Sequence, residues 1–445
     1  MKARLIPVYF LSGKNEDFER QLAILKELLA ILKELLAEVA DFLDPVSLGS
    51  ALPAADAVVF PQLLGDAFKQ IEELKRIDLP LLVVTSEFGT VAMWDWEIVS
   101  FLKAEGLKTF APYNLDLTKA ICKSLAVKRD LQQTKFLVFQ DNPGEGFQAD
   151  IFKRFYWWEE RCTQDMKQKF GVTIEKKSFK EFGEAAKQIP DQEAREVWKN
   201  WDLETPGVSD QALISAVKIY IAVKRELAGD PAIKGVGINC LNESHFSDTT
   251  PCLAWNMLFE ESGILWACEA DTVTLITKYL LHKSLDVPIM MSNVYPQLVG
   301  QAALKHEKIE SFPEVPEPEN HLLIVHCGYL GVLPKCWSTE WRLRPKVLAI
   351  VDENATAIDA RLPTGNITLT KLDHTFSKLM TIKGELVDYA QFPGSDCRNG
   401  AIVKIRDGHK LMNSFYSHHI LLTTGHWGPQ ITNLARVFDL ELEEF

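Results

Sequence analysis

Short apolar runs alternate with longer amphipathic stretches over the first part of the chain. The runs predict strands and the amphipathic stretches predict helices. In this segment the predicted strands are Leu5–Leu11, Ala57–Phe60, Leu81–Thr85 and Thr109–Ala111, with helices at 15–42, 63–77 and 91–105. Strands that alternate with helices favour a parallel sheet covered on both faces. Open sheets of this kind usually bind ligands at their carboxyl edge, in the loops that follow the strands.

The same alternation starts again near Thr134. Here the predicted strands are Lys135–Gln140, Thr173–Ser178 and Ala232–Cys240, with helices through Phe155–Trp158, at 209–228 and at 251–262. This pattern predicts a second α/β unit. The turn after its first strand, Asp141–Gly146, contains glycines without the GxGxxG spacing, so a dinucleotide site is unsupported.

From about residue 285 the helical signals fade and short strand signals dominate. The predicted strands are His321–His326, Lys346–Val351, Ala355–Leu362, Asn366–Leu372, Leu379–Tyr389, Ala401–Arg406 and His418–Thr423, followed by a helix at Ile431–Phe438. We therefore predict an α/β protein with two Rossmann-like, doubly wound domains at 1–133 and 134–284. A mostly antiparallel, β-barrel-like domain is predicted at 285–445.

Composition narrows the class of protein. The chain has 445 residues, of which 47% are hydrophobic, and this is enough for two or three cores. A net charge of −13 argues against a general nucleic-acid binder, which needs a basic face. No apolar run reaches the length of about 18 residues that a membrane span needs, and Met1–Phe10 does not resemble a signal peptide. We expect a soluble, cytoplasmic protein.

The eight cysteines are widely spaced and include no CxxC pair. This spacing favours reduced, mostly buried thiols over a structural zinc site.

One segment is duplicated in tandem. Ile24–Ala30 is followed at once by the identical Ile31–Ala37. A seven-residue insertion keeps the apolar face of a helix nearly in phase. A coiled coil usually needs about three or more heptads, so a lengthened surface helix is favoured over a coiled-coil contact.

Acidic and amide side chains follow two strands of the second unit. Glu269 and Asp271 come after a buried strand that contains Trp266, and they would point in different directions. They are either metal ligands and acid/base groups or the dipole-favoured acids at the start of the next helix. Asn242 and Glu243 lie in the loop after the preceding strand, where substrate contacts are frequent, although a solvated loop is the alternative.

Imidazole groups and one arginine lie at strand ends in the last third of the chain. His326 ends an apolar strand, and His418 and His419 start another, so only one of that adjacent pair should enter a given pocket. A neutral imidazole is a common metal ligand. Arg398 lies in a polar turn, where it could bind a polyol or simply be exposed.

Taken in order, these segments resemble the L-fucose isomerase / L-arabinose isomerase family. The resemblance rests on Pro251–Ala254, Ala267–Asp271, His326–Gly328 and Ser417–His419 with Gly425-His426. It covers roughly residues 235–445 by motif, while the N-terminal part matches by layout only. The resemblance implies a metal-dependent aldose–ketose isomerase, usually with Mn²⁺. It also implies a homotrimer or homohexamer with the site at a subunit boundary.

The resemblance also implies the roles of particular residues. The family holds its metal with a Glu, an Asp and a His, which fall on Glu269, Asn293 and His419 of this chain. An asparagine can offer an oxygen to a metal, but it cannot act as a general base. The catalytic candidates are therefore Glu269, Asn293, Glu243 and Asp271, and the candidates for substrate binding are Asn242, His326, Arg398 and His418. In such an enzyme the cation polarises the sugar carbonyl while a carboxylate moves a proton between C2 and C1 through an enediol.

Three functions stay open at this point. The favoured one is an aldose–ketose isomerase acting on a free sugar, since no phosphate-binding glycine loop is recognised. The second is another metal-dependent sugar enzyme, an epimerase or a lyase, and Asn293 favours it. The third is a sugar-binding protein without catalytic activity. The identity of the sugar and of the metal is left open.

Overall fold

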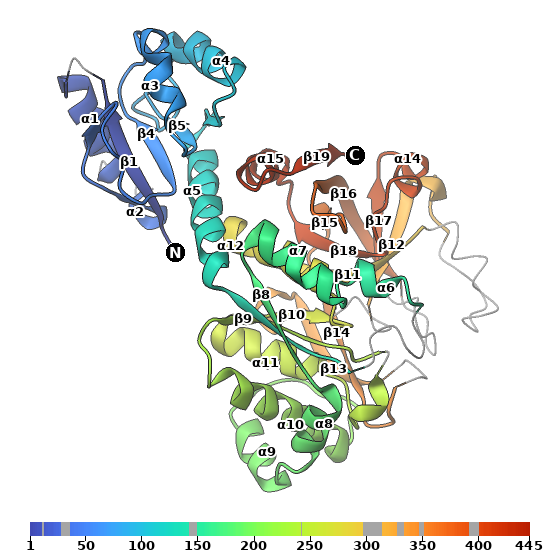
Figure 1. Ribbon diagram of the computed structural model, residues 1–445. Helices are drawn as coiled ribbons and strands as arrows, with labels where there is room; N and C mark the ends of the chain where they lie inside the picture. The colour runs from blue at the N-terminus through green and yellow to red at the C-terminus, as the bar shows by residue number, and fades with distance from the viewer. Residues whose placement is uncertain are drawn as a thin grey trace. The chain divides into compact units, whose positions relative to one another are not determined.

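The computed structural model describes residues 1–10, 13–27, 36–141, 149–241, 243–296, 314–326, 333–346, 351–390 and 400–445 (Figure 1). By internal contacts the chain divides into two compact units. The first unit contains 1–130, 283–285 and 429–439, and the second contains 131–282, 286–428 and 440–445. None of the described helices is long and apolar enough to cross a membrane.

The first unit is built on a six-stranded parallel sheet. Its strands are β1 (Ala3–Tyr9), β2 (Ala40–Phe42), β3 (Val46–Ser47), β4 (Ala57–Phe60), β5 (Leu81–Val83) and β6 (Thr109–Phe110). Its helices are α1 (Glu16–Lys26), α2 (Leu36–Val39), α3 (Ile71–Lys75), α4 (Trp96–Ala104), α5 (Leu115–Asp130) and most of α15 (Gly428–Val437). The order β2-β1-β4-β5-β6, with β3 also paired to β1, is doubly wound, as predicted. Every residue of β4 and β5 is buried, as expected of central parallel strands.

The predicted helix at 15–42 is wrong at its end. Ala40–Phe42 forms β2, which pairs in parallel with Ala3–Leu5 of β1. A short apolar stretch next to a helical pattern is ambiguous, and here pairing with β1 decides its structure. Most of the duplicated segment, residues 28–35, lies outside the described residues, so the lengthened helix stays a prediction.

The second unit begins with a four-stranded parallel sheet in the order β10-β9-β7-β8. Its strands are β7 (Lys135–Phe139), β8 (Thr173–Lys177), β9 (Ile233–Ile238) and β10 (Leu265–Cys268). The helices are α6 (Phe152–Phe155), α7 (Glu160–Phe170), α8 (Phe179–Lys187), α9 (Asp191–Trp198), α10 (Asp210–Leu227), α11 (Cys252–Ser262) and most of α12 (Thr272–Leu285). Helix α10 packs against α8, α9 and α11 (Figure 1).

Local sequence explains where several of these helices begin and end. The Ser178 hydroxyl accepts the N–H of Glu181 at the start of α8, and Ser209 caps α10 in the same way. Such N-caps satisfy backbone donors that a helix leaves unpaired. Gly171 and Gly263 end α7 and α11 in the left-handed conformation, which glycine adopts without steric cost.

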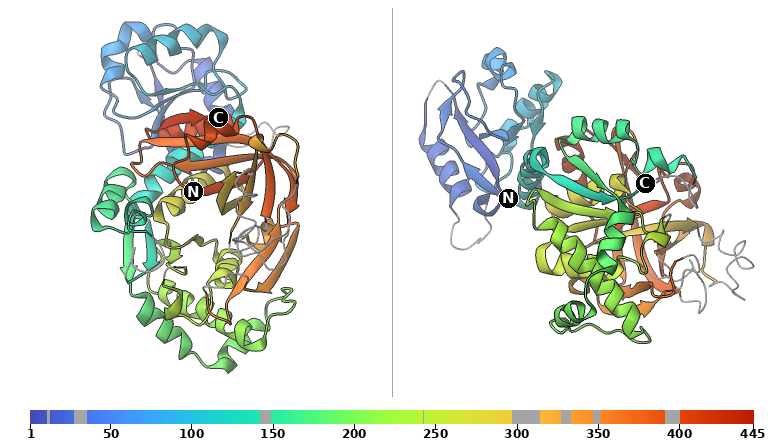
Figure 2. Two further views of the ribbon diagram at one scale, coloured as in Figure 1. Left: turned by 90° about the vertical axis from the view of Figure 1, so that its right-hand side faces the viewer. Right: turned by 60° about the horizontal axis from the view of Figure 1, so that its bottom comes forward.

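A closed antiparallel barrel follows in the same unit. Its ring is β15 (Gly365–Leu372), β18 (His419–Thr424), β11 (Ile289–Pro296), β12 (His321–Val325), β17 (Gly400–Ile405) and β16 (Lys378–Ala390), closed by pairing of β16 with β15. Outside the ring lie β19 (Glu441–Glu444), the hairpin β13 (Glu340–Pro345) and β14 (Thr356–Arg361), and α14 (Gly408–Met412). Short 3-10 turns occur at Ala67–Gln70, Met93–Asp95, Leu131–Gln133, Ser244–Phe246, Pro318–Asn320 and Lys335–Trp337. The orange and red strands in Figure 2 show the curved barrel wall, which confirms the predicted β-rich fold.

Three strands of this barrel region were not predicted, namely β11, β13 and β19. β11 is buried along its first four residues and lacks the alternation of a half-exposed strand. β19 follows α15 directly and pairs in parallel with β16. Most of the predicted strand Lys346–Val351 lies outside the described residues. The division into three domains stays a prediction.

Candidate functional site

The carboxyl edge of the four-stranded sheet in the second unit has a topological switch point between β7 and β9. The chain passes from β7 to β8 on one side and from β9 to β10 on the other. Ligands bind at such points in open α/β sheets. Gln140 follows β7 and Asn239 follows β9, and the preceding residues, Phe139 and Ile238, are paired in register. These two amides therefore lie next to each other at the switch point.

Both amides are buried with unsatisfied polar atoms. Asn239 has no exposed surface, and neither its side-chain nitrogen nor its oxygen has a partner among the described residues. The Gln140 Oε1 atom is unpartnered in the same sense. Buried polar groups almost always have hydrogen-bond partners, so two adjacent exceptions indicate a place for a polar ligand or water. Sequence analysis missed both residues, although each is the first polar residue after a buried strand.

Glu269 lies after β10, in a strained stretch of backbone. Glu269 and Ala270 have φ values of 56° and 53°, in the left-handed region that non-glycine residues rarely adopt. The Ala270 N–H donates to Ile238 O at 3.0 Å, which ties this turn to the neighbouring strand. Strain of this kind persists where the surrounding structure fixes it, and it is frequent at functional sites. Burial opposes ionisation of Glu269, but the charge of His419 holds the pKa of this carboxyl below its ordinary value.

Asp271 is the N-cap of α12. Its Oδ1 atom accepts the Thr274 N–H at 2.8 Å, and its Oδ2 atom accepts the Thr274 hydroxyl at 2.6 Å. Oδ2 also lies 2.8 Å from His419 Nδ1 and 3.4 Å from the ammonium of Lys371. Burial would raise the pKa of Asp271, but the Lys371 charge and the His419 hydrogen bond hold it below its ordinary value. The helix-cap interpretation of Asp271 is therefore confirmed, and the same carboxylate also contacts an imidazole.

His419, the first residue of β18, lies between two carboxylates. Its Nδ1 atom faces Asp271, and its Nε2 atom lies 3.4 Å from Glu269 Oε1. The ring stacks on Tyr156, with 4.8 Å between centroids, and the Tyr156 hydroxyl is 3.5 Å from Nε2. Burial disfavours the charged imidazole, but Glu269 and Asp271 together raise the pKa of His419. Tyr156 is a further site residue that sequence analysis did not single out.

Asn293 and His326 add unsatisfied polar atoms beside this cluster. Asn293 on β11 is paired directly opposite His419 on β18, which puts the two side chains on one face of the barrel wall. Its Oδ1 atom is buried and has no partner among the described residues. His326 follows β12, and both of its ring nitrogens are also unpartnered there. Burial lowers the pKa of His326 to about 4, so its imidazole is neutral near pH 7.

Whether these groups fit a divalent cation depends on Asn293. In the part of the chain that the structure describes, no group of three or more His, Cys, Asp or Glu side chains is placed to hold a metal ion. Glu269 and His419 face each other, and ligands of one cation lie about 3 Å apart, since each is about 2.1 Å from the metal. The unpartnered Asn293 Oδ1 would be the third donor. The carboxylate on His419 Nδ1 matches the outer partner that metal-binding histidines usually have.

The remaining predicted residues lie around this cluster or outside the described residues. The Glu243 carboxylate is buried and accepts the Asp141 N–H with both oxygens, at 3.0 and 3.1 Å. This contact ties Glu243 to Asp141, two positions after the end of β7. His418 is exposed to solvent, and its Nε2 atom lies 3.2 Å from the Tyr156 hydroxyl. Asn242 and Arg398 lie outside the described residues.

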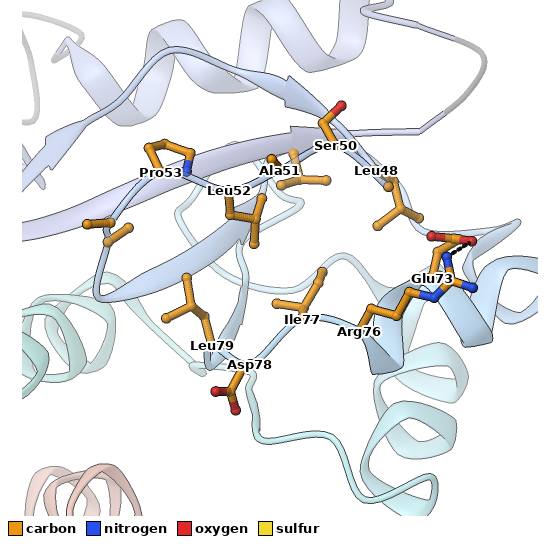
Figure 3. Close-up of a pocket in the computed structure, with 14 residues that line it drawn as sticks. Leu48, Ser50, Ala51, Leu52, Pro53, Glu73, Arg76, Ile77, Asp78 and Leu79 are labelled. Carbon is orange, nitrogen blue, oxygen red and sulfur yellow. Dashed lines mark hydrogen bonds and ion pairs between the residues drawn. The ribbon is translucent and has the colours of Figure 1, made fainter.

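The first unit has a pocket of a different character, with a volume of about 490 Å³. In Figure 3, Leu52, Ile77 and Leu79 line it with apolar groups while Asp78 points away. Arg76 and Glu73 also line the pocket, and they form an ion pair at 2.7 Å, which is the dashed line in Figure 3. Their charges therefore neutralise each other. A mostly apolar pocket with one internal ion pair is poorly suited to acid/base chemistry. The cluster around Glu269 therefore remains the candidate site.

Comparison with known proteins gives one distant similarity. No family model matches the chain. Over 293 residues the chain is 21% identical to the sulfoquinovose isomerase of Priestia aryabhattai. The match covers 63% of this chain and 60% of that relative. The similarity is thus to a sugar isomerase, across part of the length of both proteins.

Proposed function

We propose that the protein is a sugar isomerase that interconverts an aldose and the corresponding ketose. The observation that carries this proposal is the buried cluster of Glu269, His419 and Asp271 at the carboxyl edge of a doubly wound sheet. The amides and the imidazole beside it, which have polar atoms without a partner among the described residues, suit a ligand rich in hydroxyl groups. The similarity to sulfoquinovose isomerase supports isomerase chemistry on a sugar.

Glu269 is the base in this proposal. The other two candidate carboxylates have structural roles, because both oxygens of Asp271 accept hydrogen bonds from Thr274 and both oxygens of Glu243 accept the Asp141 N–H. Glu269 takes the proton from C2 of the open-chain aldose, and the carbonyl oxygen O1 gains a proton from water, which gives an enediol. The same carboxyl group, after exchange of its proton with solvent, then delivers a proton to C1 while the O2 hydroxyl releases its own to water. Protons and electrons balance over the two steps, so no redox partner is needed.

A divalent cation such as Mn²⁺, held by Glu269, His419 and Asn293, would supply Lewis-acid polarisation of the two sugar oxygens. The raised pKa of His419 sets a condition on this arrangement, because Nε2 must be unprotonated to bind a metal. Asp271 keeps Nδ1 engaged, so Nε2 is the nitrogen that is turned to Glu269. A trimeric or hexameric assembly stays a prediction of the family resemblance.

Asn239 should bind substrate hydroxyls, and Asn239→Leu tests this. The substitution removes a donor and an acceptor that have no partner among the described residues and that a ligand would satisfy. We expect kcat/KM to fall about 10–100-fold, mainly through KM, since each lost bond to a buried partner is equivalent to about 1–3 kcal/mol. The melting temperature should stay the same or rise, because an unsatisfied amide leaves the apolar interior. Steady-state kinetics and thermal unfolding measure the two effects.

Asn366→Leu, at an exposed position of β15, is the matched control and should change neither quantity. A drop in melting temperature of Asn239→Leu without any change in KM would mean that Asn239 is a structural residue of the sheet edge.

The function itself is tested by product analysis in D₂O. Purified protein with Mn²⁺ is incubated with a panel of free aldoses and a sulfonated aldose, and NMR follows ketose formation and exchange of the C2 proton. Ketose formation with deuterium at the transferred position is the expected result. Neither ketose nor exchange with any sugar, in protein shown to be folded, would overturn the proposal.

Epimerisation at C2 is the second candidate, and Asn293 favours it. An amide replaces the family's second acid at this position, so return of the proton need not follow the isomerase route. In the same experiment an epimerase would give exchange at C2 and a C2-epimeric aldose instead of a ketose.

A further inference from the structure

Lys371 of β15 is buried inside the second unit next to Asp271. Only 2% of its side chain is exposed, and the carboxylate of Asp271 is fully buried. Lysine is rarely buried to this degree unless it is paired, because taking an ammonium out of water is costly. Its Nζ atom lies 3.4 Å from Asp271 Oδ2 and donates to the Thr274 hydroxyl. The mechanism above does not use this lysine.

The contacts of Asp271 come from three separate elements. Thr274 of α12 binds both oxygens, Lys371 of β15 faces Oδ2, and His419 of β18 contacts the same Oδ2 atom. Thr274 alone would hold the carboxylate as an ordinary helix cap. The ammonium of Lys371 faces Oδ2, the same oxygen that His419 Nδ1 contacts at 2.8 Å, so it attracts the oxygen that holds the imidazole.

We propose that Lys371 is a positioning residue, which fixes the Asp271 carboxylate so that it holds His419 by Nδ1 and leaves Nε2 directed to Glu269. Its importance for catalysis rests on the proposed function, but its effect on the His419 ring does not. Histidines that bind metals depend on such outer hydrogen bonds, and loss of the outer partner typically weakens metal binding about 10–100-fold.

The test compares Lys371→Met, Lys371→Arg and a control, Lys383→Met, at an exposed position of the neighbouring strand β16. The first readout is the ¹⁵N NMR spectrum of the imidazole nitrogens of His419 in the metal-free protein. The resonances are assigned by their loss in His419→Gln. The second readout is Mn²⁺ affinity by calorimetry.

We expect Lys371→Met to shift the Nδ1 resonance of His419 and to weaken Mn²⁺ binding about 10–100-fold. Lys371→Arg, which keeps the cation, should recover most of both signals, and Lys383→Met should match the wild type. A Lys371→Met protein with a lower melting temperature but unchanged His419 resonances and Mn²⁺ affinity would overturn the proposal. If Lys371→Met does not fold, Thr274→Val, which removes the hydroxyl shared by Asp271 and Lys371, gives the same comparison.

This experiment separates the inference from the proposed function. A shift of the His419 resonances in Lys371→Met, in a protein that isomerises no sugar, would support the positioning role and overturn only the isomerase proposal. Active wild-type protein with unaffected His419 resonances in Lys371→Met would do the reverse.

Discussion

Glu269→Gln should abolish isomerase activity while leaving the protein folded. The amide has the shape of the carboxylate but cannot take the C2 proton, and a lost general base costs about 10²–10⁴-fold in rate. We expect kcat to fall by about 10³-fold for any sugar that the wild-type protein converts. Mn²⁺ binding should weaken as well, because Glu269 faces His419 Nε2 across 3.4 Å. Kinetics, C2–H exchange and calorimetry on the same preparation measure these effects.

Glu385→Gln, an exposed acid on β16, is the control and should retain full activity. Activity of Glu269→Gln within about tenfold of wild type would remove Glu269 as the base, because a general base contributes more than that. Glu243→Gln would then be the next variant to examine, since Glu243 is another buried carboxylate, in the loop after β9.

Lys278→Met should stabilise the protein at neutral pH. Lys278 of α12 is fully buried, donates to Trp266 O at 2.9 Å and lies 3.8 Å from the centre of the Trp266 ring. Burial lowers its pKa to about 7 from an ordinary value of 10.5. The unfolded chain therefore binds more protons than the folded protein between about pH 7 and 10.5, so the stability contribution of Lys278 rises with pH over that window. The full span of this contribution is on the order of 5 kcal/mol.

Replacing the amine by an apolar group of similar length removes this penalty but also loses the bond to Trp266 O. We expect a net gain of about 1–3 kcal/mol in the free energy of unfolding at pH 7. Urea denaturation at pH 7 and pH 10 should show a smaller rise with pH in Lys278→Met than in wild type. Lys234→Met, at an exposed position of β9 in the same unit, should keep the wild-type pH dependence. Equal pH slopes for wild type and Lys278→Met would contradict the assignment.

Sequence patterns predicted the sheets well because buried parallel strands are short apolar runs. β4, β7 and β9 appeared near their predicted positions, as did most barrel strands after residue 355. The patterns failed where tertiary pairing decides the structure. β2 became a strand because β1 offers an unpaired edge, and β11 has too little alternation to be recognised before its partners β12 and β18 are known.

The candidate site was only partly visible in the sequence. Glu269 and His419 were singled out from motifs, and the structure brings them together. Nothing in the sequence marked Asn239, Gln140 and Lys371, because a lone amide or lysine belongs to no motif. The two amides are unusual because they are buried with polar atoms that have no partner among the described residues, and Lys371 is unusual because it is buried beside an acid 100 positions away in the chain. The switch point depends on strand order, which periodicity does not reveal.

The bonds that meet at Asp271 also bear on how the second unit folds. They join residues 100 and 148 positions apart in the chain, from a helix after the parallel sheet to two barrel strands. Contacts of such long sequence separation form late and slow the folding of a chain. We therefore expect the parallel sheet and the barrel to open together, with native-state hydrogen exchange showing similar protection in β9 and β18. A fragment that ends before the barrel would leave Asp271 without Lys371 and His419, so the sheet alone should be a poor folding unit.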